Sequence, residues 1–260
     1  YLQRQLIHYA GDIETQAYDE GVDVDELMQH AEGELFQLSQ GNMKQDYTQI
    51  DPVIKEAVDI LQRAAQNKGG LTGIPTGYQQ MDDMTSGWQP SDLVIIAGRP
   101  AMGKTSFALS IAKNVAVDHG VPIGFFSLEM NNVQLVNRLI SNVCEISGKK
   151  ILNGQLDPSE WERLDKKIRS LTGAPIYIDD TPGLSVFELR TKARRLVREK
   201  GVKLLMIDYL QLMNANGMKF GSRQEEVSTI SRSLKGLAKE LNIPVLALSQ
   251  LSRNVENREG

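Results

Sequence analysis

The sequence predicts an α/β fold in which a central, mostly parallel β-sheet is preceded by a helical hairpin and a linker helix. The strands are expected from five short apolar runs, at residues 93–98, 122–127, 175–180, 203–209 and 244–250. These runs alternate with helical stretches and are almost continuously apolar, as strands are when helices cover both faces of a parallel sheet. Residues before 69 carry apolar side chains at helical spacing instead.

The first 39 residues predict a pair of helices. The first apolar stripe comprises Leu2, Leu6, Tyr9, Ile13 and Ala17, and the second comprises Val24, Leu27, Met28, Ala31, Leu35 and Leu38. Gly21 separates the stripes, and Asp23 or Asp25 can cap the second helix. Two amphipathic helices joined by a short turn are expected to form an antiparallel hairpin.

Residues 40–68 are interpreted as a linker that contains one amphipathic helix. This helix is expected over residues 51–67, with Asp51 as its N-cap and Pro52 at its first helical position. Its apolar face is formed by Val53, Ala57, Leu61 and Ala64. The face can pack on its own domain or on a neighbouring subunit, and the pattern leaves both open.

Residues 69–260 are expected to form one domain around the sheet. Helices are predicted after Pro158 and after Ser185, where Glu188 follows at the spacing of a capping box. The chain stops in the polar stretch SRNVENREG without a closing strand, so we expect the domain to continue beyond this point.

The composition excludes several classes of protein. The net charge is −4, so the chain lacks the excess of Lys and Arg that a broad basic nucleic-acid surface requires. It has no apolar run long enough to span a bilayer and no signal peptide. A single cysteine, Cys144, excludes a disulfide framework and favours a cytoplasmic location. Cys144, Trp88 and Trp161 are expected to be packing residues.

The first chemically specific stretch is IIAGRPAMGKTSFALSIA, residues 95–112. It fits the pattern G-x-x-x-x-G-K-[ST] between an apolar strand and a helix, where backbone N–H groups cradle phosphates. Lys104 would reach the β- and γ-phosphates, and the Thr105 hydroxyl would coordinate Mg²⁺. The expected nucleotide-binding residues are Gly98, Ala101, Met102, Gly103, Lys104, Thr105 and Ser106.

Polar residues stand at the ends of three further predicted strands. Asp208 ends a uniformly apolar run, as a Walker-B aspartate that holds Mg²⁺ does. Glu129 follows the second strand, where it can activate a water or simply favour a helix N-terminus. Gln250 ends the last strand, where its amide can sense a γ-phosphate or be solvated. Since parallel strands present their carboxyl ends at one edge, these residues together favour nucleotide hydrolysis. Asp179 and Asp180 are expected to be structural.

A family resemblance rests on several motifs in a fixed order. The run GIPTGYQQMDDMTSGWQPSDLVIIAGRPAMGKTSFALSIA is followed by FFSLEM, IDDTPGLS, MIDYLQLM and LSQLSR. Together they resemble the RecA-like motor domain of bacterial replicative DNA helicases of the DnaB type. The similarity extends from Leu71 to Arg253, and residues 1–68 resemble that family's helical hairpin and linker helix. The globular N-terminal head of the family and its C-terminal end are not among these residues.

The resemblance implies an ATP- and Mg²⁺-dependent motor that moves 5′ to 3′ along single-stranded DNA and unwinds duplex at the replication fork. Lys104 and Thr105 would carry the phosphates and Mg²⁺, Asp208 would be the Walker-B acid, Glu129 would position the attacking water, and Gln250 would couple the γ-phosphate to nearby loops. A homohexameric ring is implied, in which helix 51–67 lies against the adjacent subunit, with primase and a helicase loader as partners.

The family's arginine finger would lie past residue 260, and such a group is worth roughly 10³–10⁵ in rate. We therefore expect this chain alone to bind nucleotide but to hydrolyse it slowly. Candidate DNA contacts are Lys219, Arg223, Arg253 and Arg258, although such residues in polar loops are often only solvated. A ring would gather several copies of these cations around one channel.

Two alternatives stay open. A RecA-like DNA-dependent ATPase or recombinase would share the phosphate loop, Glu129 and Asp208 but would not unwind duplex. A nucleotide-binding fragment that docks primase or a loader through its helices would not need to hydrolyse ATP at all.

Overall fold

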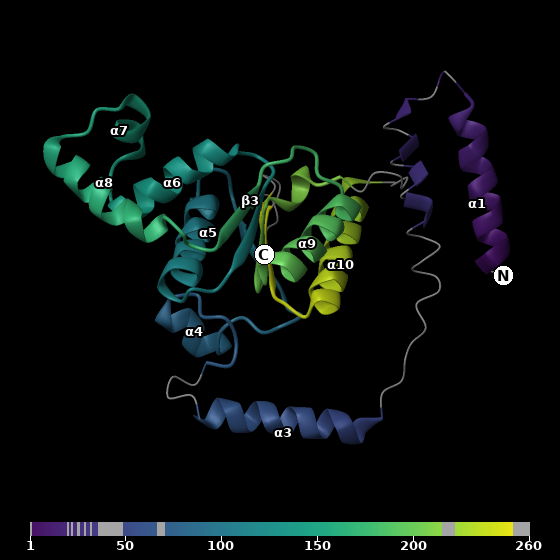
Figure 1. The fold of residues 1–260 in the computed structure, drawn as a ribbon, viewed down its shortest axis with the longest axis horizontal. Coiled ribbons are helices and arrows are strands. Elements are labelled where there is room, and N and C mark those ends of the chain that lie inside the picture. Colours follow the sequence, from purple (N-terminus) through teal and green to yellow (C-terminus); the bar gives the residue numbers. More distant parts are fainter. Residues whose placement is uncertain are drawn as a thin grey trace, which may run out of the picture. The chain divides into compact units, whose positions relative to one another are not determined.

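The computed structural model describes residues 2–19, 49–66, 71–214 and 222–251, with scattered positions between 21 and 35 (Figure 1). The chain divides into two units. One consists of Tyr1–Gln66 with Ala215–Glu226, and the other of Asn67–Asn214 with Val227–Gly260. The domain boundaries inferred at residues 39 and 68 stay a prediction.

The first unit contains helices α1, Leu2–Ala17, and α3, Ile50–Gln66. The Tyr9 hydroxyl on α1 donates a hydrogen bond of 2.8 Å to the carbonyl of Ala31, so a member of the second predicted stripe lies beside α1. Much of the second predicted helix falls outside the described residues.

Helix α3 begins one residue earlier than the sequence predicted. Asp51, the expected N-cap, lies in the first turn, where its carboxylate accepts a 3.2 Å hydrogen bond from the Gln49 side chain. An acidic residue is favourable both at the N-cap and in the first turn of a helix, so the sequence pattern does not separate these two positions. The exposed large apolar side chains of α3 are Ile50, Val53, Ile54, Val58, Ile60 and Leu61.

The second unit is built on a five-stranded, wholly parallel sheet, which confirms the predicted fold class. Its strands are β1 (Leu93–Gly98), β2 (Ile123–Ser127), β3 (Ile176–Asp179), β4 (Leu204–Asp208) and β5 (Val245–Gln250). Their order is β1-β5-β4-β2-β3, with parallel pairing throughout. The central strand is therefore β4, whose five residues are all buried.

Helices cover both faces of the sheet, with α5 on one side and α9 and α10 on the other (Figure 1). The helices that follow residue 71 are α4 (Gln79–Thr85), α5 (Lys104–Lys113), α6 (Asn132–Cys144), α7 (Gly148–Asn153), α8 (Pro158–Leu171), α9 (Val186–Lys200) and α10 (Arg223–Leu241). A π-helical turn η1 (Asn114–Asp118) follows α5, and a 3₁₀ helix η2 (Leu210–Leu212) follows β4. None of the described helices is both long and apolar enough to cross a bilayer.

The core beneath α5 and α6 contains Trp88, which is 3% exposed, and Cys144 lies on α6 with no exposed surface. Both are packing residues, as predicted. Trp161 is not, because it is 49% exposed on α8. The adjacent Glu160 takes the inward position instead, where it bonds Lys150 and the backbone N–H of Asp157.

The segment ahead of β1 is pinned by a close backbone approach. Ile74 and Trp88 form an antiparallel bridge with two N–H···O bonds of 2.9 Å. A β-carbon on Gly73 would lie 2.5 Å from the Trp88 carbonyl oxygen, so only glycine fits there. This explains the SGW run, since Gly87 and Trp88 form the facing side of the contact.

Helix α9 has half of the predicted capping box. The Ser185 hydroxyl accepts a 3.1 Å bond from the backbone N–H of Glu188. The Glu188 carboxylate, however, pairs with Lys192 at 3.1 Å, one turn further along the helix. The competing cation thus accounts for the missing reciprocal bond.

Candidate active site

The phosphate-loop pattern forms the connection from β1 to α5. Ala101 and Gly103 have left-handed backbone angles, with φ of 62° and 81°. A β-carbon on Gly98 would lie 3.2 Å from Cγ of Lys104, so the glycine gives room for the lysine stem. The Lys104 ammonium donates to the carbonyls of Gly98 at 2.9 Å and Arg99 at 3.0 Å. The loop therefore holds its cation at the carboxyl end of β1.

Asp208 lies beside this loop at the end of β4. It is 2% exposed, and its carboxylate accepts a 2.7 Å hydrogen bond from the Thr105 hydroxyl. Burial raises the pKa of Asp208, as does the negative charge of Glu129, whereas the Thr105 bond and the cations Lys104 and Arg138 lower it. The net shift of the Asp208 pKa is upward, because burial disfavours the charged carboxylate. A perturbed acid of this kind in a cavity is a candidate functional residue.

Thr105 and Asp208 fit a magnesium site. Mg²⁺ binds hard oxygen ligands and usually takes only one or two from the protein, with water and phosphate supplying the rest. The hydroxyl and carboxylate oxygens are 2.7 Å apart, close enough to coordinate one cation. In the part of the chain described, no group of three or more His, Cys, Asp or Glu residues is arranged so that it could hold a metal ion by itself.

A cavity of about 190 Å³ brings the predicted catalytic residues together. It is lined by Pro100, Ala101, Gly103, Lys104, Thr105, Glu129, Met130, Arg138, Asp208, Tyr209 and Gln250. Apart from Arg138 on α6, the polar side chains follow or end β1, β2, β4 and β5, which are neighbours in the sheet. All four predicted catalytic residues, Glu129, Lys104, Asp208 and Gln250, thus face one space that we call the phosphate pocket.

Three predicted nucleotide-binding residues lie just outside the phosphate pocket. Gly98 and Met102 line a second cavity of about 400 Å³, which shares Gly103 and Lys104 with the phosphate pocket. Ser106 lines a third cavity of about 550 Å³, which we call the α6 pocket.

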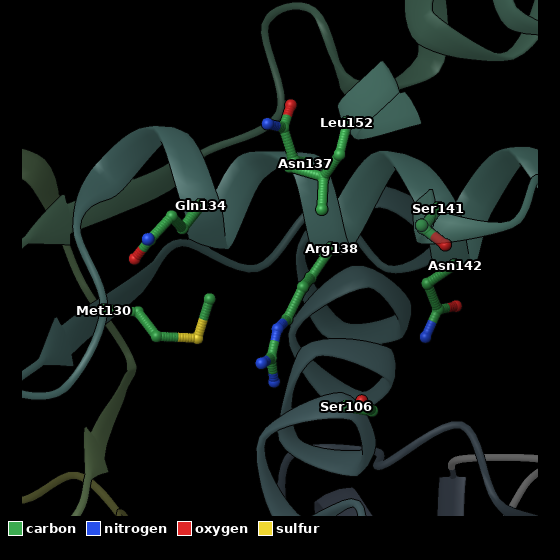
Figure 2. A pocket seen from close by; sticks show the side chains of 9 residues that line it. Ser106, Met130, Gln134, Asn137, Arg138, Ser141, Asn142 and Leu152 are labelled. Atoms are coloured by element: carbon green, nitrogen blue, oxygen red, sulfur yellow. The ribbon is translucent and has the colours of Figure 1, made fainter. Parts of the chain in front are cut away.

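The α6 pocket lies between the start of α5 and helices α6 and α7 (Figure 2). Its lining residues are Ser106, Met130, Gln134, Asn137, Arg138, Ser141, Asn142, Gly148 and Leu152. Figure 2 shows Arg138 extending from α6 toward α5. Since Met130 and Arg138 also line the phosphate pocket, the two cavities adjoin.

Sequence reasoning missed Arg138 and Tyr209 as lining residues. Arg138 lies nine residues after Glu129, on a helix whose rotation about its axis decides which residues face the site. Tyr209 follows Asp208 directly, and its phenol has a pKa raised by burial and by the charges of Glu129 and Asp208. The sequence did offer a signal for Tyr209, because this residue directly follows the predicted acid Asp208. It offered none for Arg138, whose place in the pocket depends on how α6 packs.

The remaining strand-end aspartates, Asp179 and Asp180, bond to neighbouring helices and turns. Asp179 forms a 2.9 Å ion pair with Lys192 and accepts a 3.0 Å bond from the N–H of Thr181. Asp180 accepts bonds of 2.8 and 3.0 Å from the backbone and side chain of Asn132, at the start of α6.

Of the predicted DNA contacts, only Arg223 falls within the described residues. It begins α10 and forms an ion pair with Glu226. Lys219, Arg253 and Arg258 lie outside the described residues, and all four DNA contacts stay predictions.

Comparison with known proteins places this geometry in a family. Residues 73–260 match the DnaB-like helicase C-terminal domain. Over 256 residues the chain is 43% identical to the replicative DNA helicase DnaB of Geobacillus stearothermophilus, covering 98% of this chain and 56% of the relative. The replicative DNA helicase DnaC of Bacillus subtilis is similar at the same identity and the same coverage. The chain thus spans about half the length of these curated relatives.

Solved structures agree. One solved ATPase domain matches with a TM-score of 0.74 and 38% identity, covering 82% of this chain and 75% of that one. A DnaB-like replicative helicase, solved in a study of its interactions with primase, matches with a TM-score of 0.71 and 34% identity, covering 100% of this chain and 60% of that one. The resemblance inferred from the motifs is confirmed: the chain belongs to the DnaB-like helicase C-terminal domain family.

Proposed function

We propose that this chain is the ATP-hydrolysing motor of a replicative DNA helicase, which moves along single-stranded DNA and unwinds duplex at the fork. The observation that carries the proposal is the phosphate pocket. It gathers a phosphate-loop lysine, a hydroxyl–carboxylate pair and two further polar strand ends in one cavity. This set meets the needs of nucleotide hydrolysis, which depends on positioning and electrostatic stabilisation.

Each residue has a distinct role in this proposal. Lys104 binds the β- and γ-phosphate oxygens, while Thr105 and Asp208 hold Mg²⁺, which neutralises charge on the same phosphates. Glu129 orients a water toward the γ-phosphate and accepts its proton. Gln250 presents its side-chain amide to the γ-phosphate from the end of β5.

The α6 pocket is proposed to hold the nucleoside. Ser106 immediately follows Thr105, so a phosphate chain that runs along the loop leaves it toward this cavity. The volume of about 550 Å³ lies within the usual range of ligand pockets, roughly 300–1,000 Å³. Its many side-chain amides and hydroxyls provide donors and acceptors for a base and a ribose.

Assembly into a ring of six subunits is proposed through α3. Its apolar side chains are strongly exposed, with Leu61 at 67%. An exposed apolar surface of this kind is typical of a site that binds another protein surface, here the adjacent subunit. DNA would pass through the ring near Lys219, Arg223, Arg253 and Arg258. Direction of movement 5′ to 3′, primase and a loader as partners, and a cytoplasmic location complete the proposal.

The first test measures ATP hydrolysis with and without single-stranded DNA, alongside the mass of the species in solution. DNA-stimulated turnover by a ring-sized species, abolished in Glu129→Gln, would support the motor. Tight nucleotide binding by a monomer with slow turnover would assign only the nucleotide-holding role to this chain. Absence of nucleotide binding would refute the proposal.

A forked DNA substrate separates the motor from a recombinase-like ATPase. The motor displaces one strand in an ATP-dependent reaction, which Lys104→Ala abolishes because the phosphates lose their principal cation. ATP hydrolysis on DNA without displacement, in an assembled ring, would favour the recombinase-like alternative.

A further inference from the structure

Gln211 makes an unusual set of contacts next to the phosphate pocket. Its side-chain Nε2 donates to the backbone carbonyl of Gln250 at 3.0 Å, and its Oε1 accepts from the backbone N–H of Gln250 at 3.1 Å. The same Nε2 lies 3.0 Å from the Ser249 hydroxyl oxygen. One carboxamide thus bonds both backbone groups of a single residue.

The sheet explains why this contact is needed. The β4–β5 ladder ends at the pair Ile207 and Ala247, although β5 continues for three more residues. After Asp208 the chain turns into η2, which carries Gln211. The Gln211 side chain therefore supplies, at Gln250, the pairing that a continued β4 would have supplied.

The other side of this strand end is fixed by β1. Gly98 pairs with Gln250, and the N–H of Leu251 donates to the Gly98 carbonyl at 3.1 Å. The backbone of Gln250 is thus held from two directions, by the first residue of the phosphate loop and by Gln211. The Gln250 side chain lines the phosphate pocket from this point.

We propose that Gln211 is a positioning residue, which holds the backbone of Gln250 so that the Gln250 amide reaches the γ-phosphate of bound ATP. The inference rests on the proposed function of the phosphate pocket and adds to it. Gln211 itself does not line that pocket, so its effect on the nucleotide passes through Gln250. It should matter for triphosphate and not for diphosphate, because only the triphosphate carries the group that Gln250 senses.

The test compares equilibrium binding of ADP and of a non-hydrolysable ATP analogue, with Mg²⁺, so that turnover is not required. Gln211→Met keeps the length of the side chain and removes both hydrogen bonds to Gln250. We expect its affinity for the analogue to fall about tenfold, the value of one hydrogen bond to a charged group, with ADP affinity within twofold. Gln80→Met, at an exposed glutamine of α4, is the matched control and should change neither.

A double-mutant cycle excludes a general structural effect. Gln250→Ala alone should cause a similar selective loss, and adding Gln211→Met should cause no further loss, because Gln211 acts through Gln250. The cycle is read together with the thermal unfolding midpoint, which should stay within a few degrees in each variant.

Three outcomes would overturn the inference. Equal losses for ADP and the analogue would show a structural role, additive losses in the double variant would show action independent of Gln250, and unchanged binding would show no role. If the unmodified chain bound neither nucleotide, the proposed function itself would fail and this inference with it.

Discussion

The close approach of Gly73 to Trp88 makes a quantitative prediction for Gly73→Ala. The new methyl group would lie 2.5 Å from the Trp88 carbonyl oxygen and 2.6 Å from two backbone carbons, distances that real β-carbons do not adopt. Since the nearby atoms are backbone, the two strands of the bridge must separate. Two backbone hydrogen bonds of 2.9 Å would be lost, and Trp88, now 3% exposed, would shift in the core.

Two hydrogen bonds contribute about 2 kcal/mol, and disturbed packing of a buried aromatic residue brings the expected loss to about 2–4 kcal/mol. For a unit of this size the thermal midpoint should fall by roughly 5–15 °C. Thermal unfolding followed by circular dichroism measures the shift. The control is Gly236→Ala on α10, where a β-carbon meets nothing within 4 Å and the midpoint should rise because alanine favours the helix. An unchanged midpoint for Gly73→Ala would refute the steric reasoning.

Three further predictions concern the site, the surface and pH. Asp208→Asn should raise the Mg²⁺ concentration needed for half-maximal nucleotide binding by at least about tenfold, because a neutral amide replaces a carboxylate ligand. A Mg²⁺ titration with fluorescent nucleotide measures this concentration, and an unchanged value would argue against Asp208 as a ligand. Leu61→Asp should reduce the mass of any assembled species without lowering the thermal midpoint, because this side chain is 67% exposed; a stable ring in light scattering would exclude docking through that face. Hydrogen bonds from the Ser159 hydroxyl and from the N–H of Glu160 hold the pKa of Asp157 at about 2, below its ordinary value of 3.8. The ionised form of Asp157 therefore stabilises α8 fully above about pH 4, and this contribution is lost as the pH falls through 2. The midpoint of Asp157→Asn, which keeps the cap but not the charge, should therefore approach that of the unmodified chain as pH falls from 4 to 2, and a difference independent of pH would contradict the assignment.

The limits of the five strands could be predicted from the apolar runs in the sequence. Each of β1 to β5 begins and ends within one residue of its apolar run, because a run without polar alternation has clear limits. Strands β2 and β4 are buried along their whole length, whereas β1 is only partly buried, with Ile95 48% exposed. The convergence of Glu129, Asp208 and Gln250 could also be predicted, because parallel strands place their carboxyl ends at one edge of the sheet.

What the sequence did not predict depends on tertiary packing. Trp161 looked like a core residue by type, but its neighbour Glu160 occupies the inward position through bonds to Lys150 and Asp157. Arg138 reaches the phosphate pocket only because α6 packs against α5 in a particular rotation. Gln211 acts through backbone groups 39 residues away along the chain, a contact that no local pattern encodes.

The contrast between the two tryptophans has a practical consequence for spectroscopy. The chain has two indoles, one at 3% exposure in the core and one at 49% exposure on α8. An aqueous quencher such as iodide should remove the red-shifted emission of Trp161 and leave the blue-shifted emission of Trp88. The quenched component then reports on whatever covers the outer face of α8, while the protected component reports on the integrity of the core, so one unlabelled sample can distinguish association from unfolding.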